Sequence, residues 1–283
     1  MPTLRVILFT ALAMLAFAGN SLLCHMALKN TAIDAASFTT VRLVAAAITL
    51  WLLLVCFAKS KAILGNWPSA LALFIYAAGF SFAYINLTAA TGALLLFGAV
   101  QLSMIGVGMW SGERLSGLQM GGLLLAVAGL IVLVLPGLAA PPWFSAALMV
   151  VAGVAWGVYS LRGRGAGDPM AVTGGNFIRT IPFTLVLSVL MLSHNHLDQT
   201  GIYLAVASGA ITSGIGYAIW YRALPELKAT QAATVQLSVP VIAAMGGIVL
   251  LGESFSLRLA LASVAIIAGI ALVIFEKSKA ATA

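Results

Sequence analysis

Ten long apolar runs dominate this sequence, and each is long enough to cross a membrane as a helix. A transmembrane helix needs about 20 mostly apolar residues, because each residue adds 1.5 Å toward a hydrocarbon core about 30 Å thick. Only 7 % of the residues are charged, against about 25 % in soluble domains, so the chain cannot build a water-compatible surface. We therefore predict an all-α integral membrane protein without a separate soluble domain. The ten predicted transmembrane helices cover about 6–28, 37–58, 68–86, 90–110, 118–135, 143–161, 172–193, 201–222, 229–251 and 257–275.

A short turn motif occurs twice in the chain. Gly112-Glu113-Arg114-Leu115-Ser116 returns as Gly252-Glu253-Ser254-Phe255-Ser256, and from residue 112 to residue 252 the offset is 140 residues. Small residues elsewhere superpose at the same offset, which indicates an internal duplication. We predict a first five-helix repeat over 1–139 and a second over 140–283. Because five is odd, the second repeat enters the membrane upside down, as in the inverted repeats of secondary transporters.

The positive charges are unevenly distributed between the predicted loops. If the N-terminus is cytoplasmic, the cytoplasmic helix ends carry ten of the fourteen Lys and Arg residues, and the outer ends carry only Lys29 and Arg258. This bias predicts that both termini are cytoplasmic. The net charge of +7 therefore reflects membrane topology, and we expect the lipid bilayer and a small-molecule substrate as partners, with no nucleic acid. A monomer is the expected assembly.

The first run begins like a signal peptide, because Arg5 precedes an apolar stretch that includes Ala16-Phe17-Ala18. However, the apolar run continues to Leu28, which is longer than the apolar region of a signal peptide. We expect this run to remain as the first transmembrane helix.

A few polar side chains fall within the predicted spans. An unpaired amide at this depth costs several kcal/mol, so Asn20 must face another helix or water, and both alternatives remain open. Pro240 cannot donate to the carbonyl of Gln236, which leaves irregular backbone near mid-membrane. Gln101 and Gln236 take nearly matching places in the two halves and form the leading predicted site. Gly98 and Pro240 are the predicted hinge positions.

Aromatic side chains follow one face of the third predicted helix. Tyr76, Phe80 and Tyr84 are spaced by four residues, so they share one helix face. Trp156 and Tyr159 lie on one side of the sixth predicted helix. Such a stripe is usually packing, but in a transporter it also forms a wall for apolar or aromatic substrates.

Several residues near helix ends have simpler interpretations. Trp220 and Tyr221 are typical of an aromatic belt at the inner interface, and His25 is expected at the outer interface. Arg42 lies about five residues into the second span and Arg179 matches it in the seventh. Both are predicted to extend toward the membrane surface and to act as anchors or packing clamps rather than substrate ligands.

All seven acidic residues fall at predicted loops or helix ends. A carboxylate within the membrane is the usual device for proton coupling or cation binding, so its absence favours a neutral or zwitterionic substrate, or flow down a gradient. His194, His196 and Asp198 gather in one outer loop, where a mobile polar loop explains them better than a metal site. We predict no metal, no cofactor and no enzymatic activity.

The paired motifs place Glu113 and Glu253 at opposite membrane faces. No single substrate site could contain both glutamates. We therefore expect each one to cap the exposed amides at the start of the next helix, where the helix dipole favours negative charge.

Four features occur together in this chain: the ten spans in two halves, Arg42, Pro240 thirteen residues before Glu253, and the paired turns followed by Ser116 and Ser256. With these features, the sequence resembles the drug/metabolite transporter superfamily, EamA type, over essentially the whole chain. One departure is Val100, which stands where the second half has Pro240. The resemblance implies a bacterial secondary transporter in which the first, third, fourth, sixth, eighth and ninth helices line the central path. Within the superfamily, the chain is most similar to exporters of aromatic amino acids that also pass methyl viologen.

Together, these features predict a secondary transporter in the bacterial inner membrane. It would export amino acids, including aromatic ones, and related small metabolites by alternating access. The alternative is an exporter of multiple drugs or cationic compounds. The predicted cavity residues are Asn20, Tyr76, Phe80, Tyr84, Gln101, Trp156, Tyr159, Tyr217, Gln236 and Ser238.

Overall fold

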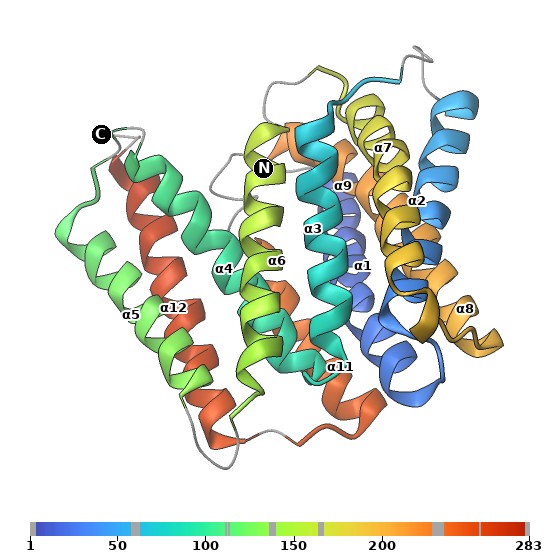
Figure 1. Cartoon of the computed structure of the whole chain (residues 1–283). Helices are drawn as coiled ribbons and strands as arrows, with labels where there is room; N and C mark the ends of the chain where they lie inside the picture. The colour runs from blue at the N-terminus through green and yellow to red at the C-terminus, as the bar shows by residue number, and fades with distance from the viewer. Residues whose placement is uncertain are drawn as a thin grey trace.

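The computed structural model describes residues 4–57, 63–110, 112, 114–135, 140–163, 167–227, 235–254 and 256–280, with main chain only at 225 and over 274–280. In these residues every regular element is a helix (Figure 1). The first seven long helices are α1 (Leu4–Asn30), α2 (Ala35–Phe57), α3 (Trp67–Tyr84), α4 (Ala89–Trp110), α5 (Gly117–Val134), α6 (Trp143–Arg162) and α7 (Pro169–Leu190). The remaining elements are η1 (Leu192–His194), α8 (Gln199–Val206), η2 (Ala207–Ile215), α9 (Gly216–Ala223), η3 (Leu224–Glu226), α11 (Ser238–Leu251) and α12 (Leu257–Ala280).

Each predicted span corresponds to a helical segment of the structure. Eight helical segments in the described part of the chain are long and apolar enough to cross a membrane, and the eighth of them runs without a break from Gln199 to Ala223. The ninth predicted span is seen only as α11 and a short segment before it, because residues 228–234 lie outside the described part. The all-α membrane fold is therefore confirmed.

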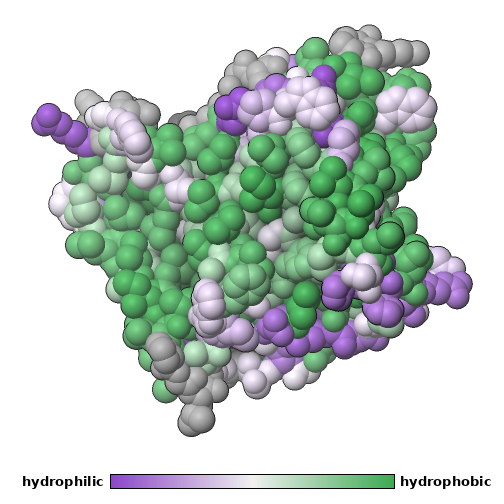
Figure 2. All heavy atoms as spheres, viewed as in Figure 1, coloured by the Kyte–Doolittle hydropathy of each residue, from purple (hydrophilic) through white to green (hydrophobic). Residues whose placement is uncertain are grey.

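The outer surface of the bundle is apolar. Figure 2 shows hydrophobic residues over the middle of the visible face, with hydrophilic residues gathered toward its upper and lower edges. Leu124, Val249 and Leu261 are 62 %, 77 % and 59 % exposed on three different helices. Soluble monomers rarely expose a continuous apolar surface of this extent. This surface is suited to lipid.

The helices pack mainly in pairs drawn from the two halves of the chain. α5 lies against α12 in a pair set to one side of Figure 1, α2 lies against α7, and α4 lies against α11. α3 contacts α6, while α1 contacts α8, η2 and α9. Exchanging the two five-helix halves maps this set of contacts onto itself. The packing is what inverted repeats require, although the inverted relation and the boundary near residue 139 stay predictions.

Glycines allow α5 and α12 to pack with their backbones in close contact. A Cβ added at Gly122 would lie 2.6 Å from the carbonyl oxygen of Gly269, and one added at Gly269 would lie 2.5 Å from that of Gly122. Gly117 and Gly121 also lie in α5, but neither has a neighbouring atom within 4 Å of an added Cβ. The close contact is therefore one residue farther along the helix, on the face that meets α12.

The first turn motif ends α4 and starts α5 as predicted. Gly112 follows α4 with a φ of +93°, a conformation that glycine adopts without strain. The Ser116 hydroxyl accepts from the N–H of Gln119, and the Gln119 side chain accepts from the N–H of Ser116, at 3.2 and 2.8 Å. These two bonds form a capping box at the start of α5. Glu113 lies outside the described residues.

The eighth span contains an unexpected stretch of π-helix. The sequence predicts one regular helix over 201–222, but η2 is a π-helix between α8 and α9. A π-helix is rare and is often found at functional sites. Gly209 in η2 packs on α2 so closely that an added Cβ would lie 2.1 Å from the carbonyl oxygen of Arg42. This glycine fixes the position of the π-helix against α2.

The loop between α7 and α8 is bound to the start of α2. One oxygen of the Asp34 carboxylate accepts from the N–H groups of Ala36 and Ser37, and the other accepts from the N–H of His196 at 2.8 Å. Asp198 accepts from the N–H of Gly201 and so caps α8. These bonds hold the loop that was expected to be mobile. The described residues contain no cluster of three metal-binding side chains.

Asp34 gives the loop a predicted sensitivity to acid. Burial by itself would raise the pKa of the Asp34 carboxyl, but hydrogen bonds from Ser37, His196 and Ala36 outweigh burial and hold its pKa below the usual 3.8. A lowered pKa stabilises the folded state above that value, and this stabilisation is lost as the pH falls below about 3.8. Below that pH, we expect backbone amides in the loop between α7 and α8 to exchange faster with solvent. Mass spectrometry would measure the exchange rate of the wild type and of the Asp34→Asn variant at each pH. An Asp198→Asn control should keep the acid step, and an unchanged step in Asp34→Asn would refute the role of Asp34.

Candidate functional site

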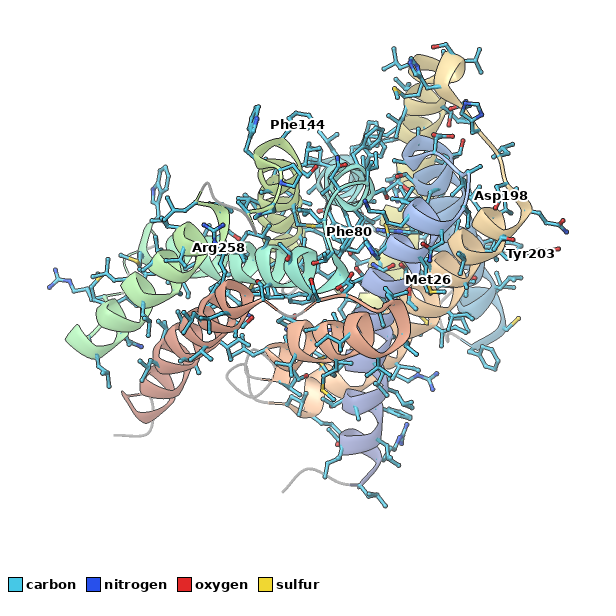
Figure 3. The ribbon with its side chains drawn as sticks, turned by 90° about the horizontal axis from the view of Figure 1, so that it is seen from below. Met26, Phe80, Phe144, Asp198, Tyr203 and Arg258 are labelled. Atoms are coloured by element: carbon cyan, nitrogen blue, oxygen red, sulfur yellow. The ribbon has the colours of Figure 1, made fainter. Side chains whose placement is uncertain are left out.

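A narrow cavity lies in the centre of the helix bundle. Its volume is about 20 Å³, which is room for about one water molecule. Residues from α1, α3, α4, α6, η2, α9 and the segment before α11 line it, and these belong to the six spans that the resemblance implies for the central path. Figure 3 shows Phe80, one of the lining residues, in the interior of the bundle, whereas Asp198 and Tyr203 lie at its edge. The lining residues are Phe17, Asn20, Ser21, Tyr76, Phe80, Leu96, Phe97, Trp156, Thr212, Ser213, Tyr217 and Gln236.

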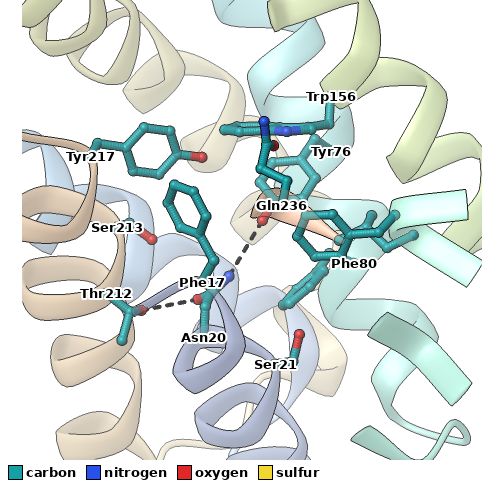
Figure 4. A pocket seen from close by; sticks show the side chains of 12 residues that line it. Phe17, Asn20, Ser21, Tyr76, Phe80, Trp156, Thr212, Ser213, Tyr217 and Gln236 are labelled. Atoms are coloured by element: carbon teal, nitrogen blue, oxygen red, sulfur yellow. Dashed lines mark hydrogen bonds between the residues drawn. The ribbon is translucent and has the colours of Figure 1, made fainter. Parts of the chain in front are cut away.

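Asn20 is the centre of a hydrogen-bond network on one wall of this cavity (Figure 4). Its carbonyl oxygen accepts from the hydroxyls of Ser208 at 2.6 Å and Thr212 at 3.3 Å. Its amide donates to the hydroxyl of Tyr76 at 3.3 Å. Both alternatives for Asn20 therefore hold, since this side chain joins three spans and also lines the cavity.

The π-helix explains why two hydroxyls reach the same amide oxygen. Ser208 and Thr212 both lie in η2, four residues apart, and the Thr212 hydroxyl also donates to the carbonyl of Ser208 at 2.7 Å. A π-helix bonds residues five apart, so some carbonyls in this stretch accept side-chain donors instead of regular α-helical N–H groups. The irregular backbone and the polar wall therefore occur together.

Aromatic rings form the opposite wall, centred on Trp156. Its ring lies 4.8 Å from Tyr76 and 5.3 Å from Tyr217, measured between centroids. Phe17 packs edge-on against Tyr217 at 5.6 Å and against Trp220 at 6.0 Å. Trp220 is only 7 % exposed, so the prediction that it belongs to a lipid-facing belt is wrong. Its ring packs in the core of the bundle instead.

The structure places the predicted site residues in two groups. Asn20, Tyr76, Phe80, Trp156, Tyr217 and Gln236 line the cavity, whereas Tyr84, Gln101, Tyr159 and Ser238 do not. The Tyr84 hydroxyl donates to the carbonyl of Ala89 at 3.3 Å, and Tyr159 is buried behind Trp156 at 5.4 Å. Gln101 is buried in α4. As substrate contacts, all ten residues stay predictions.

Ser238 lies on another surface of the molecule. Its hydroxyl donates to the carbonyl of Val235 at 2.6 Å, and it lines a separate apolar groove between α1 and α11 together with Val6 and Ile242. A serine hydroxyl bonded within its own turn needs no other partner. This explains how a polar residue occurs at this place outside the cavity.

Sequence reasoning omitted half of the cavity lining. Signals were present for some of the residues, because Phe97 precedes Gln101 by one turn and Thr212 and Ser213 are polar residues within a span. Leu96 gives no signal, since an apolar residue in a membrane helix is expected on any face. The omitted lining residues are Phe17, Ser21, Leu96, Phe97, Thr212 and Ser213.

The predicted hinge residues differ in their local structure. α4 is a continuous helix through Gly98. Pro240 lies in the first turn of α11, which begins at Ser238 after a turn at Leu237. N–H groups in a first helical turn have no partner within the helix. Pro240 therefore does not remove a hydrogen bond from the interior of a regular helix, which differs from the prediction. The break precedes the proline, and the hinge roles stay predictions.

Glu253 does not cap the helix that follows it. Its carboxylate accepts from the N–H of Ala89 at 2.5 Å and from the N–H of Ala90 at 3.3 Å, at the start of α4. The start of α12 is capped instead by Ser256, whose hydroxyl accepts from the N–H of Leu259. Glu253 caps a helix start as predicted, but the predicted helix is wrong. The folded chain brings the start of α4 next to this turn, although the two are far apart in sequence.

His25 joins the same cluster. Its Nε2 lies 3.3 Å from the Oε1 of Glu253, and the two side chains are only 11 % and 7 % exposed. His25 is therefore a buried partner of Glu253, and its predicted place at the outer interface stays a prediction. The cluster connects α1, the start of α4 and the end of α11.

The two matching arginines have different surroundings. Arg179 donates to the carbonyls of Leu64 and Gly175 at 2.7 and 2.9 Å, which agrees with a packing clamp. Arg42 is 1 % exposed, and its guanidinium lies 4.9 Å from the ring centroid of Phe80 and 5.6 Å from that of Tyr76. The prediction that Arg42 extends to the membrane surface is therefore wrong, because its side chain points into the core.

The cavity is equipped to bind a molecule. Its lining combines amide and hydroxyl groups on one wall with aromatic rings on the other, and none of the lining residues is ionisable at neutral pH. Such a site can orient a polar head by hydrogen bonds and hold an apolar body against rings.

Comparison with known proteins gives similarities of three kinds: to a family model, to a protein sequence and to a solved structure. The model of the EamA-like transporter family matches residues 143–275, which lie within the second predicted repeat. The uncharacterized protein PA1977 of Pseudomonas aeruginosa is 53 % identical over 275 residues, covering 97 % of this chain and 96 % of that protein. A crystal structure with 17 % identity has a TM-score of 0.69 and covers 96 % of this chain and 97 % of its own. At that identity, the structural likeness shows the fold alone.

Proposed function

The chain belongs, through residues 143–275, to the EamA-like transporter family, and on that premise we propose that it exports amino acids. The members of this family are transporters rather than enzymes, so a multi-pass membrane transporter is the established starting point. The proposed substrates are amino acids, including aromatic ones, and related small metabolites. The proposed mechanism is secondary transport by alternating access.

The observation that carries the proposal is the pairing of an amide–hydroxyl wall with an aromatic wall in one central cavity. Asn20 and Thr212 provide a polar wall for polar groups of a substrate. Trp156 and Tyr217 provide an aromatic wall for its side chain, where a pair of rings contributes about 0.5–1.5 kcal/mol beyond area burial. An amino acid with an aromatic side chain presents these two surfaces together.

Alternating access is supported by the small size of the cavity. Its volume of about 20 Å³ is far below the roughly 300–1,000 Å³ of ordinary ligand sites. A substrate would therefore need the lining helices to move apart. The π-helix η2 and the break before α11 are irregular segments beside the cavity, where a backbone change requires the fewest regular hydrogen bonds to break.

The proposed location is the inner membrane of a bacterium, with both termini in the cytoplasm. The distribution of Lys and Arg supports this orientation. We propose that the transporter acts as a monomer.

Counterflow in liposomes tests the substrate class. Purified protein would be reconstituted with unlabelled amino acid inside, and uptake of labelled Phe, Trp, Thr or Met would be measured against empty liposomes. We expect transient accumulation of at least one of the four amino acids. Failure of counterflow with all four would overturn the proposed substrate class.

An exporter of cationic compounds is the second candidate function. The aromatic wall favours it, because Trp and Tyr rings attract quaternary ammonium groups. Resistance of expressing cells to such compounds, or proton release when they are added to purified protein, would favour this candidate over amino-acid export.

A further inference from the structure

We propose that Arg42 binds the carboxylate of the transported substrate, in a site that extends the central cavity behind Tyr76 and Phe80. This inference rests on the proposed function and specifies its substrate class. Arg42 is 1 % exposed, and the Nε and Nη1 atoms of its guanidinium are buried without a hydrogen-bond partner. Two buried donors without partners on a permanent cation are costly, and a bound anion would remove that cost.

No protein carboxylate compensates the charge of Arg42. In the part of the chain that the structure describes, the only contact within 4.0 Å between a basic side chain and a carboxylate joins His25 to Glu253. The rings of Tyr76 and Phe80 lie near the guanidinium, but a cation–π contact returns only a small part of the lost hydration. A neutral acceptor such as water would satisfy the donors and leave the charge unbalanced. A carboxylate would accept from the two donors and also balance the charge.

Comparison with other arginines argues against a packing role. Arg162 donates to the side chains of Ser69 and Asn66, and Arg179 donates to two carbonyls. Arg258 donates to two carbonyls at the end of α5. These three arginines use their donors to join helix ends. Arg42, by contrast, lies among aromatic rings with two donors unused.

Arg42 is adjacent to the cavity through the same two rings. Tyr76 and Phe80 line the cavity on one side and face the guanidinium on the other. Tyr76 is also hydrogen-bonded to Asn20. A shift of these two rings would therefore change the polar wall and, at the same time, open a path from the cavity to Arg42. An apolar substrate body could then occupy the cavity while its carboxylate reaches the guanidinium.

The position of Arg42 also separates the two candidate functions. A fixed positive charge behind the aromatic wall attracts a carboxylate and repels a quaternary ammonium ion. The seventh span carries its sequence counterpart, Arg179, whose Nη1 already donates to two carbonyls. The anion site is therefore expected on the Arg42 side only, and Arg179 provides a matched control.

Thermal unfolding of the purified protein with chosen probes tests the inference. The probes are L-phenylalanine and phenylacetate as carboxylates, L-phenylalaninamide as the matched amide, and tetraphenylphosphonium as a cation. For wild type, we expect the carboxylates to raise the unfolding midpoint and the amide and the cation to leave it unchanged. Arg42→Gln should weaken carboxylate binding by at least about 30-fold, whereas Arg179→Gln should retain it. Equal shifts with phenylalanine and its amide, no shift with either carboxylate, or an undiminished shift in Arg42→Gln would each overturn the proposal.

A second variant distinguishes a ligand-binding arginine from a packing clamp. Without ligand, Arg42→Met should unfold at the same temperature as wild type or above it, because it removes a buried charge that has no partner. A large fall in the midpoint, exceeding that of Arg179→Met, would show that Arg42 holds the fold together. If the Arg42 variants do not fold, the comparison of acid with amide on wild type still decides the question.

Failure of this inference can be told apart from failure of the proposed function. If the carboxylates stabilise the protein through Arg42 but no amino acid shows counterflow, the anion site stands and amino-acid export is wrong. If an amino acid shows counterflow that Arg42→Gln leaves unchanged, export stands and the role of Arg42 is wrong.

Discussion

Replacement of Glu253 by alanine is expected to destabilise the protein by about 3–5 kcal/mol, because several buried polar groups lose their partner and each costs about 1–3 kcal/mol. The substitution leaves the N–H groups of Ala89 and Ala90 without their acceptor and leaves His25 without its buried partner. Glu253→Gln should lose less, because an amide oxygen can still accept one of the two N–H groups. Thermal unfolding of the purified protein in detergent measures the loss.

Ser256→Ala is the matched control for this result. Ser256 caps α12 from the same turn through one hydrogen bond to Leu259, and loss of such a cap costs about 1 kcal/mol. If Glu253→Ala is no less stable than Ser256→Ala, the cluster around Glu253 contributes little and its geometry has been overinterpreted.

Replacement of Asn20 by leucine should nearly abolish transport while the protein still reaches the membrane. Leucine is close to asparagine in size but removes the acceptor shared by Ser208 and Thr212 and the donor to Tyr76. The loss of the polar wall should reduce kcat/KM by roughly 30- to 100-fold, since each unsatisfied buried polar group costs about 1–3 kcal/mol. Initial rates of counterflow, with the amino acid that gives the strongest signal, measure the effect.

Ser238→Ala provides the comparison for Asn20→Leu. Its hydroxyl bonds only within its own turn and lies outside the cavity, so transport should remain within about twofold of wild type. Transport by Asn20→Leu at the rate of Ser238→Ala would remove the hydrogen-bond network from the transport site.

The helices were predictable from sequence because hydropathy alone determines them in a membrane. Without water, every backbone polar group must be satisfied within a helix, so a long apolar run has one available structure. The same reasoning does not predict the π-helix η2. Serine and threonine also occur in regular helices, so Ser208 and Thr212 give no signal of a π-helix in the sequence. Their preference for the amide of Asn20, 188 and 192 residues away, depends on tertiary packing that composition does not encode.

The cavity residues were partly predictable for a related reason. Polar and aromatic residues within spans are few, so Asn20, Trp156 and Gln236 could be identified by type and depth. Which face of a helix they occupy could not be determined, because an apolar environment surrounds the bundle and an apolar core fills it. The rule that arginine extends toward water also failed at Arg42, whose local sequence resembles that of Arg179. In the folded chain, Arg42 lies against the aromatic rings of α3, whereas Arg179 donates to two carbonyls.

The small central cavity has a consequence for any measured affinity. A molecule larger than water binds only the fraction of protein in which the walls have separated, so the apparent dissociation constant equals the intrinsic constant divided by that fraction. With a cavity of about 20 Å³ in this conformation, weak apparent binding is compatible with a well-matched site. A change that favours separated walls, at Phe17 or in η2, would strengthen binding without adding a contact, and equilibrium constants for this protein therefore report on its conformations as well as on its chemistry.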